Sequence, residues 1–84
     1  MPDTPPPKRT RKRKEEPSLA VTFGAALRKA RLDASLSQAD IAEASGIMHN
    51  RISPIEHGKV DLRLSTAGKL ARAVGRSLRD LLPD

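Results

Sequence analysis

The stretch from Leu36 to Gly58 limits the fold of this chain more than any other feature. Two short amphipathic segments within it are separated by a turn that carries Gly46. Glycine is the preferred residue at the left-handed position that ends a helix. Ser37, which precedes the first segment, can accept a hydrogen bond from a free N–H of the first helical turn. The stretch therefore predicts two helices, near residues 38–45 and 49–57, joined by a tight turn.

The second of these segments separates apolar from polar side chains. Ile52 and Ile55 are three residues apart and share one side of a helix. The polar side chains then face elsewhere; they are His49, Asn50, Arg51 and Ser53. Two helices joined by a glycine-containing turn form a helix-turn-helix, whose second helix enters the major groove of DNA. The alternative is an ordinary helical hairpin, and the glycine spacing together with the polar group favours the DNA-binding motif.

Pro54 departs from this pattern. Proline inside a helix removes one backbone hydrogen bond and clashes with the carbonyl four residues earlier, at a cost of about 3 kcal/mol. That carbonyl belongs to Asn50. We expect a kinked or partly 3₁₀ helix here, with contacts to bases shifted toward Met48–Arg51.

Helical periodicity accounts for most of the remaining sequence. Apolar residues at three- and four-residue spacing predict a first helix over residues 22–34. A fourth helix is expected over residues 66–74, with Ser65 as its N-cap, and a short fifth helix over residues 78–82, with Ser77 as its N-cap. No strand pattern competes with these helices. The sequence therefore predicts an all-α fold, a compact five-helix domain.

Residues 1–17 differ in composition from residues 18–84, which we assign to the folded domain. They contain five of the seven prolines and six basic against three acidic residues, so they have little apolar surface to bury and should be disordered. We interpret the basic run as an arm that binds the DNA minor groove or backbone. A solvated tail and a nuclear-localisation signal are the alternatives. The basic residues of the arm are Lys8, Arg9, Arg11, Lys12, Arg13 and Lys14.

Composition limits the classes of function. The formal net charge of +6 favours a polyanionic partner such as DNA. The chain has no cysteine and its two histidines stand without a cluster of ligands, so we expect no metal and no cofactor. No apolar run approaches the roughly 18 residues that cross a bilayer, so no membrane partner is expected. With no nucleophile–base pair or phosphate loop, we expect a non-enzymatic, cytoplasmic and nucleoid-associated protein.

Taken together, the motifs resemble the lambda-repressor-like (Xre/Cro-type) helix-turn-helix family. The resemblance covers about residues 23–82 and rests on several matching pieces that are specific only in combination. These pieces are Leu27-Arg28 with Arg31, Leu36-Ser37-Gln38 with Ile41-Ala42 and Gly46-Ile47, Ile52-Ser53 with Ile55-Glu56 and Gly58, and Leu70-Ala71 with Val74-Gly75, Leu78 and Leu81-Leu82. Ala67-Gly68 departs from the family, which usually has a large apolar residue there.

The resemblance implies roles for individual residues. Gln38 would contact a DNA phosphate from the start of the second helix, and Arg31 and Glu56 would form a structural ion pair between the first and third helices. At the start of the third helix, Asn50 can bind adenine N6 and N7 in a bidentate manner. The other DNA-binding candidates are Met48 for a thymine methyl, His49 for a guanine acceptor, Ser53 on the same helix, and Arg51 and Lys59 for phosphates. The candidates for the dimer interface are Leu78, Leu81 and Leu82.

Three functions follow from these expectations. The first is a sequence-specific transcriptional repressor that binds double-stranded DNA with a palindromic operator as a homodimer. A more specific version is the autoregulating antitoxin of a toxin–antitoxin pair, which would also bind a toxin protein. The alternative of another class is a protein-interaction adaptor that bridges transcription factors without its own sequence readout, which Pro54 slightly favours.

Overall fold

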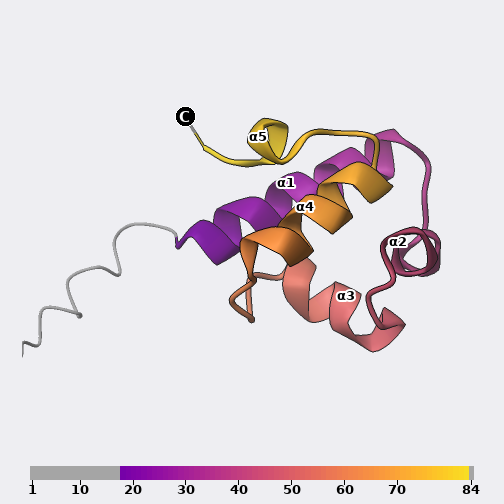
Figure 1. Ribbon diagram of the computed structural model, residues 1–84, viewed down its shortest axis with the longest axis horizontal. Helices are drawn as coiled ribbons and strands as arrows, with labels where there is room; N and C mark the ends of the chain where they lie inside the picture. The colour runs from indigo at the N-terminus through magenta and orange to yellow at the C-terminus, as the bar shows by residue number, and fades with distance from the viewer. Residues whose placement is uncertain (1–17, 84) are drawn as a thin grey trace, which may run out of the picture.

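The computed structural model describes residues 18–83 of the chain, and within this range it contains five helices and no strand (Figure 1). The helices are α1 (Leu19–Asp33), α2 (Gln38–Ser45), α3 (His49–Glu56), α4 (Leu64–Ala73) and α5 (Leu78–Leu81). The third helix packs against α1 and α2, α4 packs against α2 and α5, and α5 returns to α1. The predicted all-α fold is therefore confirmed.

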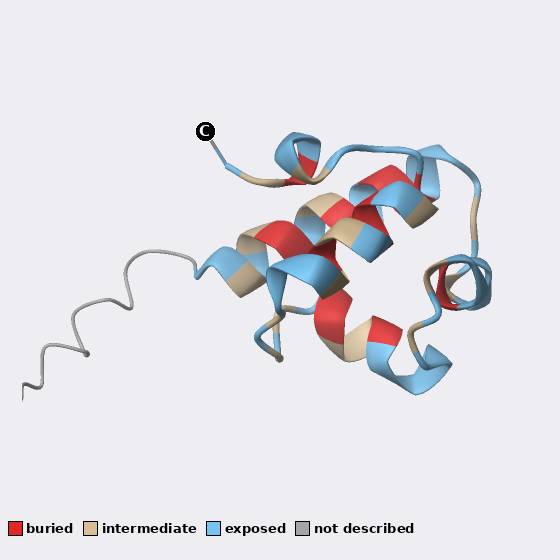
Figure 2. Ribbon diagram, in the orientation of Figure 1, coloured by how far each residue is buried: buried red, intermediate tan, exposed pale blue. Residues whose placement is uncertain are grey.

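The core is a cluster of buried hydrophobic side chains to which all five helices contribute. Figure 2 shows the buried positions of α1, α3 and α4 on the sides that face the interior. The largest fully buried side chains are Leu27 of α1, Ile41 of α2, Ile52 and Ile55 of α3, and Leu70 of α4. Burial of each such side chain contributes about 1.5–3 kcal/mol. Because α3 supplies two of the five, its orientation is firmly set by the core.

Two helices begin earlier than the sequence pattern predicts. The first starts at Leu19 rather than residue 22, because the hydroxyl of Ser18 accepts a hydrogen bond from the N–H of Val21 at 3.2 Å. The fourth starts at Leu64, so the prediction that Ser65 caps it is wrong. Its N-cap position is Arg63, which makes no side-chain capping bond. The start of α4 is therefore not marked by a local capping signal.

The third helix is α-helical from His49 to Glu56, with Pro54 inside it. The expected 3₁₀ segment is not present. The proline lies in the last turn, where only one hydrogen bond, to the carbonyl of Asn50, is lost. The helix ends in a Schellman motif, in which the N–H of Lys59 donates to the carbonyl of Pro54 at 2.9 Å. Burial of the two isoleucines of α3 and this closing bond offset the proline.

Two glycines let α1 approach the C-terminal end of α3. A Cβ atom at Gly24 would contact the carbonyl oxygen of Ile55 and lie 2.7 Å from that of Glu56. Gly58 has φ +70°, and a Cβ there would lie 2.6 Å from the Cα of Val21. Both close contacts involve backbone, which cannot move aside as a flexible side chain can. The glycines therefore set how deeply α3 sits against α1.

Candidate nucleic-acid interface

The start of α3 presents polar side chains to solvent, and the opposite side of the helix is buried in the core. His49, Asn50 and Arg51 are exposed, whereas Ile52 and Ile55 are buried. Met48 occupies the N-cap position and is 66% exposed. Ser53 and Pro54 are half-buried. The exposed row can approach a ligand without any change in the core.

Helix α2, which precedes the turn into α3, is capped at both of its ends. The side chain of Ser37 accepts from the N–H of Asp40 at 2.9 Å, and the Asp40 carboxylate accepts from the Ser37 N–H at 2.8 Å, a capping box. The backbone N–H of Ser37 and then its hydroxyl stabilise the ionised Asp40 and hold the pKa of its carboxyl below the ordinary value. At the other end, Gly46 is left-handed at φ +79° and donates to the Ala42 carbonyl at 2.9 Å. These local bonds define the direction in which the chain enters α3.

A buried ion pair joins α1 to α3. The Arg31 Nε donates to Glu56 Oε2 at 2.6 Å, and its NH2 nitrogen donates to Glu56 Oε1 at 3.1 Å. The hydrogen bonds that Arg31 donates to Glu56 raise the pKa of its guanidinium above the ordinary value, although burial acts in the opposite direction. The remaining guanidinium nitrogen donates to the carbonyl of Leu36 at 3.0 Å. This network connects the loop before α2 with the end of α3.

Gln38 belongs to the same network. Its side-chain amide donates to Glu56 Oε1 at 3.1 Å, and the residue is half-buried at the first position of α2. An amide nitrogen carries two hydrogens, so this bond leaves one hydrogen and the carbonyl oxygen for other partners. The structure therefore assigns Gln38 a structural bond in addition to the phosphate contact expected from the sequence, which stays a prediction.

The C-terminal end of α3 adds His57, which the sequence interpretation did not name as a site residue. His57 is exposed, and its Nδ1 lies 2.8 Å from the carbonyl oxygen of Ser53, which makes Nδ1 the donor and leaves Nε2 open to solvent. Pro54 lies on the same helix one turn after Asn50. Pro54 follows Asn50 by four residues and His57 follows Pro54 by three, and this helical spacing was the available signal. Lys59, just beyond the helix, is exposed.

The three leucines expected at a dimer interface lie in two environments. Leu81 is 3% exposed and belongs to the core of the domain, so it cannot reach a partner. Leu78 and Leu82 are half-buried and border a shallow groove on the outer side of α5. A second groove, which Leu82 also lines, runs between the first turns of α1 and α4, where Leu64 is 73% exposed. Apolar surface is therefore continuous around the end of α5.

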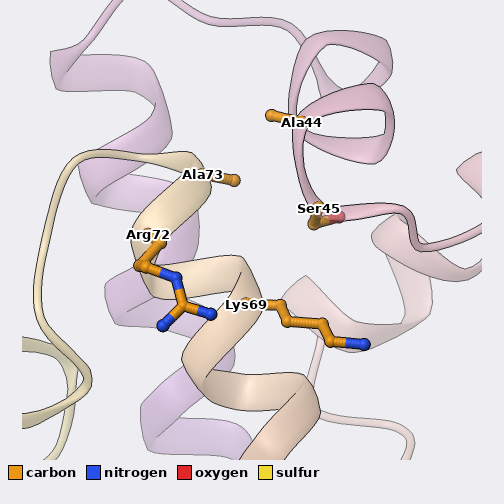
Figure 3. A pocket seen from close by; sticks show the side chains of 5 residues that line it. All are labelled: Ala44, Ser45, Lys69, Arg72 and Ala73. Atoms are coloured by element: carbon orange, nitrogen blue, oxygen red, sulfur yellow. The ribbon is translucent and has the colours of Figure 1, made fainter.

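A separate groove lies between the C-terminal end of α2 and the middle of α4. Figure 3 shows Lys69 and Arg72 extending from α4 beside Ala44 and Ser45 of α2, with Ala73 at the rim. Both basic residues are exposed, and the groove has a volume of about 200 Å³. It lies at the opposite end of α2 from Gln38, which places it outside the row of candidate DNA-binding residues on α3.

The sequence also led to expectations about a basic arm, metal binding and membrane contact. The basic arm, residues 8–14, lies outside the described residues. Among residues 18–83 no three histidine or acidic side chains gather as metal ligands would. None of the helices described is long and apolar enough to cross a membrane.

Comparison with known proteins shows which relatives share this arrangement. A family model described as Helix-turn-helix matches residues 27–81. The restriction-modification controller protein C.AhdI from Aeromonas hydrophila is 34% identical, with a TM-score of 0.70, over 74% of this chain and 94% of that one. The clp gene regulator ClgR from C. glutamicum is 32% identical, with a TM-score of 0.75, over 79% of this chain and 86% of that one.

A third similar structure is the controller protein C.Esp1396I, a tetramer in complex with its natural 35 base-pair operator. It is 24% identical, with a TM-score of 0.68, over 74% of this chain and 82% of that one, and the similarity shows a shared fold. The comparison with curated proteins found no match.

Proposed function

Because this chain belongs to the lambda-repressor-like (Xre/Cro-type) helix-turn-helix family of transcription regulators, we propose that it is a repressor that binds a palindromic operator as a homodimer. One observation carries the proposal: the start of α3 is polar and exposed, while the same helix is fixed by the buried Ile52 and Ile55 and, at its C-terminal end, by the buried network of Glu56 with Arg31 and Gln38. A fixed helix can read bases with little loss of backbone freedom on binding.

In this proposal the start of α3 lies in the major groove. Asn50 binds adenine N6 and N7, His49 donates to a guanine acceptor, and Met48 packs on a thymine methyl. Phosphate contacts hold the helix in register without reading sequence. The residues proposed for phosphates are Arg51, Lys59 and Gln38, with the basic arm adding further contacts along the backbone.

The homodimer follows from the apolar surface around α5. Leu78 and Leu82 are half-buried in the monomer and would be covered by the same surface of a second copy, as two-fold symmetry requires. A two-fold dimer places its two α3 helices in successive major grooves, about 34 Å apart. The operator is therefore expected to be a palindrome with half-sites about one helical turn apart.

The test is a binding measurement with the full chain on DNA from upstream of its own gene and on scrambled DNA, across a salt series. We expect selective binding that Asn50→Ala weakens by about 5- to 150-fold, as the loss of one bidentate base contact implies. Arg72→Ala, which removes a charge from the α2–α4 groove, is the matched control and should keep the selectivity. If upstream DNA shows no preference, selection from a random DNA pool decides whether any specific sequence is bound. Binding without sequence preference in both experiments would refute the repressor.

A more specific version of the same proposal is an autoregulating antitoxin that also binds a toxin protein. The similarity to controller and gene regulators supports regulation of transcription and is equally compatible with a regulator that has no toxin partner. Co-expression with the neighbouring gene distinguishes the two. A stable complex of the two products that still binds the operator would favour the antitoxin.

The second candidate is a non-enzymatic adaptor that bridges proteins of the transcription machinery. The exposed Lys69 and Arg72, outside the DNA-binding row, favour it because they suit an acidic protein surface. An adaptor of this kind would bind DNA without sequence preference, and Arg72→Ala rather than Asn50→Ala would reduce its function in transcription. Either role would be carried out in the cytoplasm, at the nucleoid.

A further inference from the structure

The folded domain carries most of its positive charge outside the helix-turn-helix. Residues 36–58 contain one basic and three acidic side chains, whereas residues 62–79 contain five basic and no acidic side chains. DNA binding by the start of α3 therefore leaves most of this charge without an assigned contact. The five basic residues are all exposed, and they are Arg63, Lys69, Arg72, Arg76 and Arg79.

Lys69 and Arg72 differ from the other three because they line the groove between α2 and α4. They are three residues apart on α4 and therefore share one side of that helix. Within residues 18–83 the ion pairs lie inside α1 and between α1 and α3, so neither residue is paired with an acid of the described chain. Attraction to the C-terminal end of the helix dipole accounts for Arg72 in the last turn, but not for Lys69 before it. The stability of α4 therefore does not explain the two cations together.

The polar groups that remain free in this groove are hydrogen-bond donors. The ammonium group of Lys69 and the guanidinium of Arg72 can donate but cannot accept. The third polar side chain is Ser45, whose hydroxyl donates to the carbonyl of Ala42 at 3.4 Å and accepts from the N–H of Ile47 at 3.2 Å. A ligand of the groove must therefore supply acceptors, and negatively charged acceptors such as carboxylates make the stronger bonds.

The walls of the groove favour a protein side chain over a small molecule or a DNA backbone. Figure 3 shows Ala44 of α2 and Ala73 of α4 facing each other across it, so a small apolar group can enter there. The volume of about 200 Å³ is below the roughly 300–1,000 Å³ of small-molecule pockets. DNA carries a phosphate at every step, and the exposed Glu43 beside Ala44 would repel these phosphates. A protein segment can instead place an apolar side chain between two acidic ones.

We propose that the α2–α4 groove binds an acidic protein segment, whose carboxylates pair with Lys69 and Arg72 while a small apolar side chain enters between the two helices. Because the two cations are three residues apart, the carboxylates are expected within four residues of one another. The groove lies outside the row of candidate DNA-binding residues on α3, so the partner can bind a DNA-bound regulator. The inference goes beyond the proposed repressor, because it requires no operator, and it specifies the partner of the proposed adaptor.

The experiment selects peptides from a random phage-displayed library on the immobilised full chain, in an excess of double-stranded DNA of random sequence. The DNA occupies the DNA-binding residues, including the basic arm, which would otherwise attract any acidic peptide. The enriched peptides are then measured by fluorescence anisotropy. We expect them to carry two acidic residues within four positions. They should bind Lys69→Ala/Arg72→Ala about 2- to 30-fold more weakly than the wild type, as the loss of two exposed ion pairs implies.

The matched control is Arg28→Ala/Arg63→Ala, which removes two exposed charges from residues that line none of the three grooves described above. This variant should bind the enriched peptides as the wild type does. Equal losses in the two double variants would show attraction by net charge alone and would refute the groove. Enriched peptides that lack acidic residues, or that bind Lys69→Ala/Arg72→Ala undiminished, would refute it as well.

A salt series on DNA without the peptide decides whether the two cations belong to the DNA-binding surface instead. The salt dependence of Lys69→Ala/Arg72→Ala should match that of the wild type. A log–log slope that is smaller by about 1.8 would assign both cations to phosphates and refute the proposal. Selection of an operator by the full chain tests the repressor separately, so either proposal can fail while the other holds. Circular dichroism should show both double variants folded, because alanine favours the helix.

Discussion

At the scale of single residues, the buried guanidinium of Arg31 makes the stability of the domain depend on Glu56. The carboxylate accepts two bonds from Arg31 and one from Gln38, and its side chain is fully buried. Removing one partner of a buried pair leaves an uncompensated charge that cannot reach water. The role of this pair is therefore structural, and its effect on DNA binding would be indirect.

Glu56→Ala should lower the free energy of unfolding by about 3–5 kcal/mol, measured by urea denaturation of the full chain. The matched control is Asp33→Ala, which removes the Lys29–Asp33 pair, whose side chains are 77% and 52% exposed. That change should cost no more than about 0.5 kcal/mol, because exposed pairs at this helical spacing contribute little. Equal effects of the two substitutions would show that the Arg31–Glu56 pair is not buried in solution.

At the scale of elements, two glycines inside helices should respond to alanine in opposite directions. Gly68 of α4 has no atom within 4 Å of an added Cβ, whereas the Cβ at Gly24 would press on the backbone of α3. Gly68→Ala should raise the melting temperature, because alanine is about 0.5–1 kcal/mol more favourable in a helix. Gly24→Ala should lower it, because α1 and α3 must separate. A similar gain for both would contradict the close contact of these helices.

The capping box of α2 should make the stability of the domain depend on pH in the acidic range. The pKa of Asp40 is below its ordinary value in the folded chain because its carboxylate is bonded to the Ser37 N–H and hydroxyl. A group with a lowered folded pKa stabilises the fold above its unfolded pKa, near 4, and this contribution is lost as pH falls through the folded pKa. Urea unfolding from pH 6 to pH 2 should therefore show a smaller loss of stability in Asp40→Asn than in the wild type. Asp61→Asn, an exposed acid outside any cap, is the control and should follow the wild type.

At the scale of the whole molecule, the apolar surface around α5 predicts self-association. Leu82→Glu should weaken the proposed dimer at least tenfold, because a charge replaces a leucine whose burial contributes about 1.5–3 kcal/mol. Sedimentation over a range of concentrations measures the dissociation constant. Leu32→Glu is the control, since Leu32 is a half-exposed leucine of α1 that does not line either groove beside α5. A wild-type chain that stays monomeric at all concentrations would refute the dimer.

What the sequence alone determined is the helix-turn-helix. The bounds of α2, and of α3 to within one residue, follow from Ser37, Gly46 and the Ile52–Ile55 spacing, because capping bonds and left-handed glycines act within a few residues of the chain. The short α5 after Ser77 follows for the same reason, since Ser77 and Asp80 form another capping box. The all-α class follows from periodicity.

Which of these side chains meet depends on how distant segments of the chain pack together. The continuous α3 through Pro54, the burial of Leu81 and the bond from Gln38 to Glu56 all depend on contacts between segments far apart in the chain. Such contacts outweigh local preference when the free energy gained by burial is larger than the free energy lost with a missing cap or one hydrogen bond. For this reason the sequence identified the motif, whereas the bond from Gln38 to Glu56 and the burial of Leu81 became evident only from the folded chain.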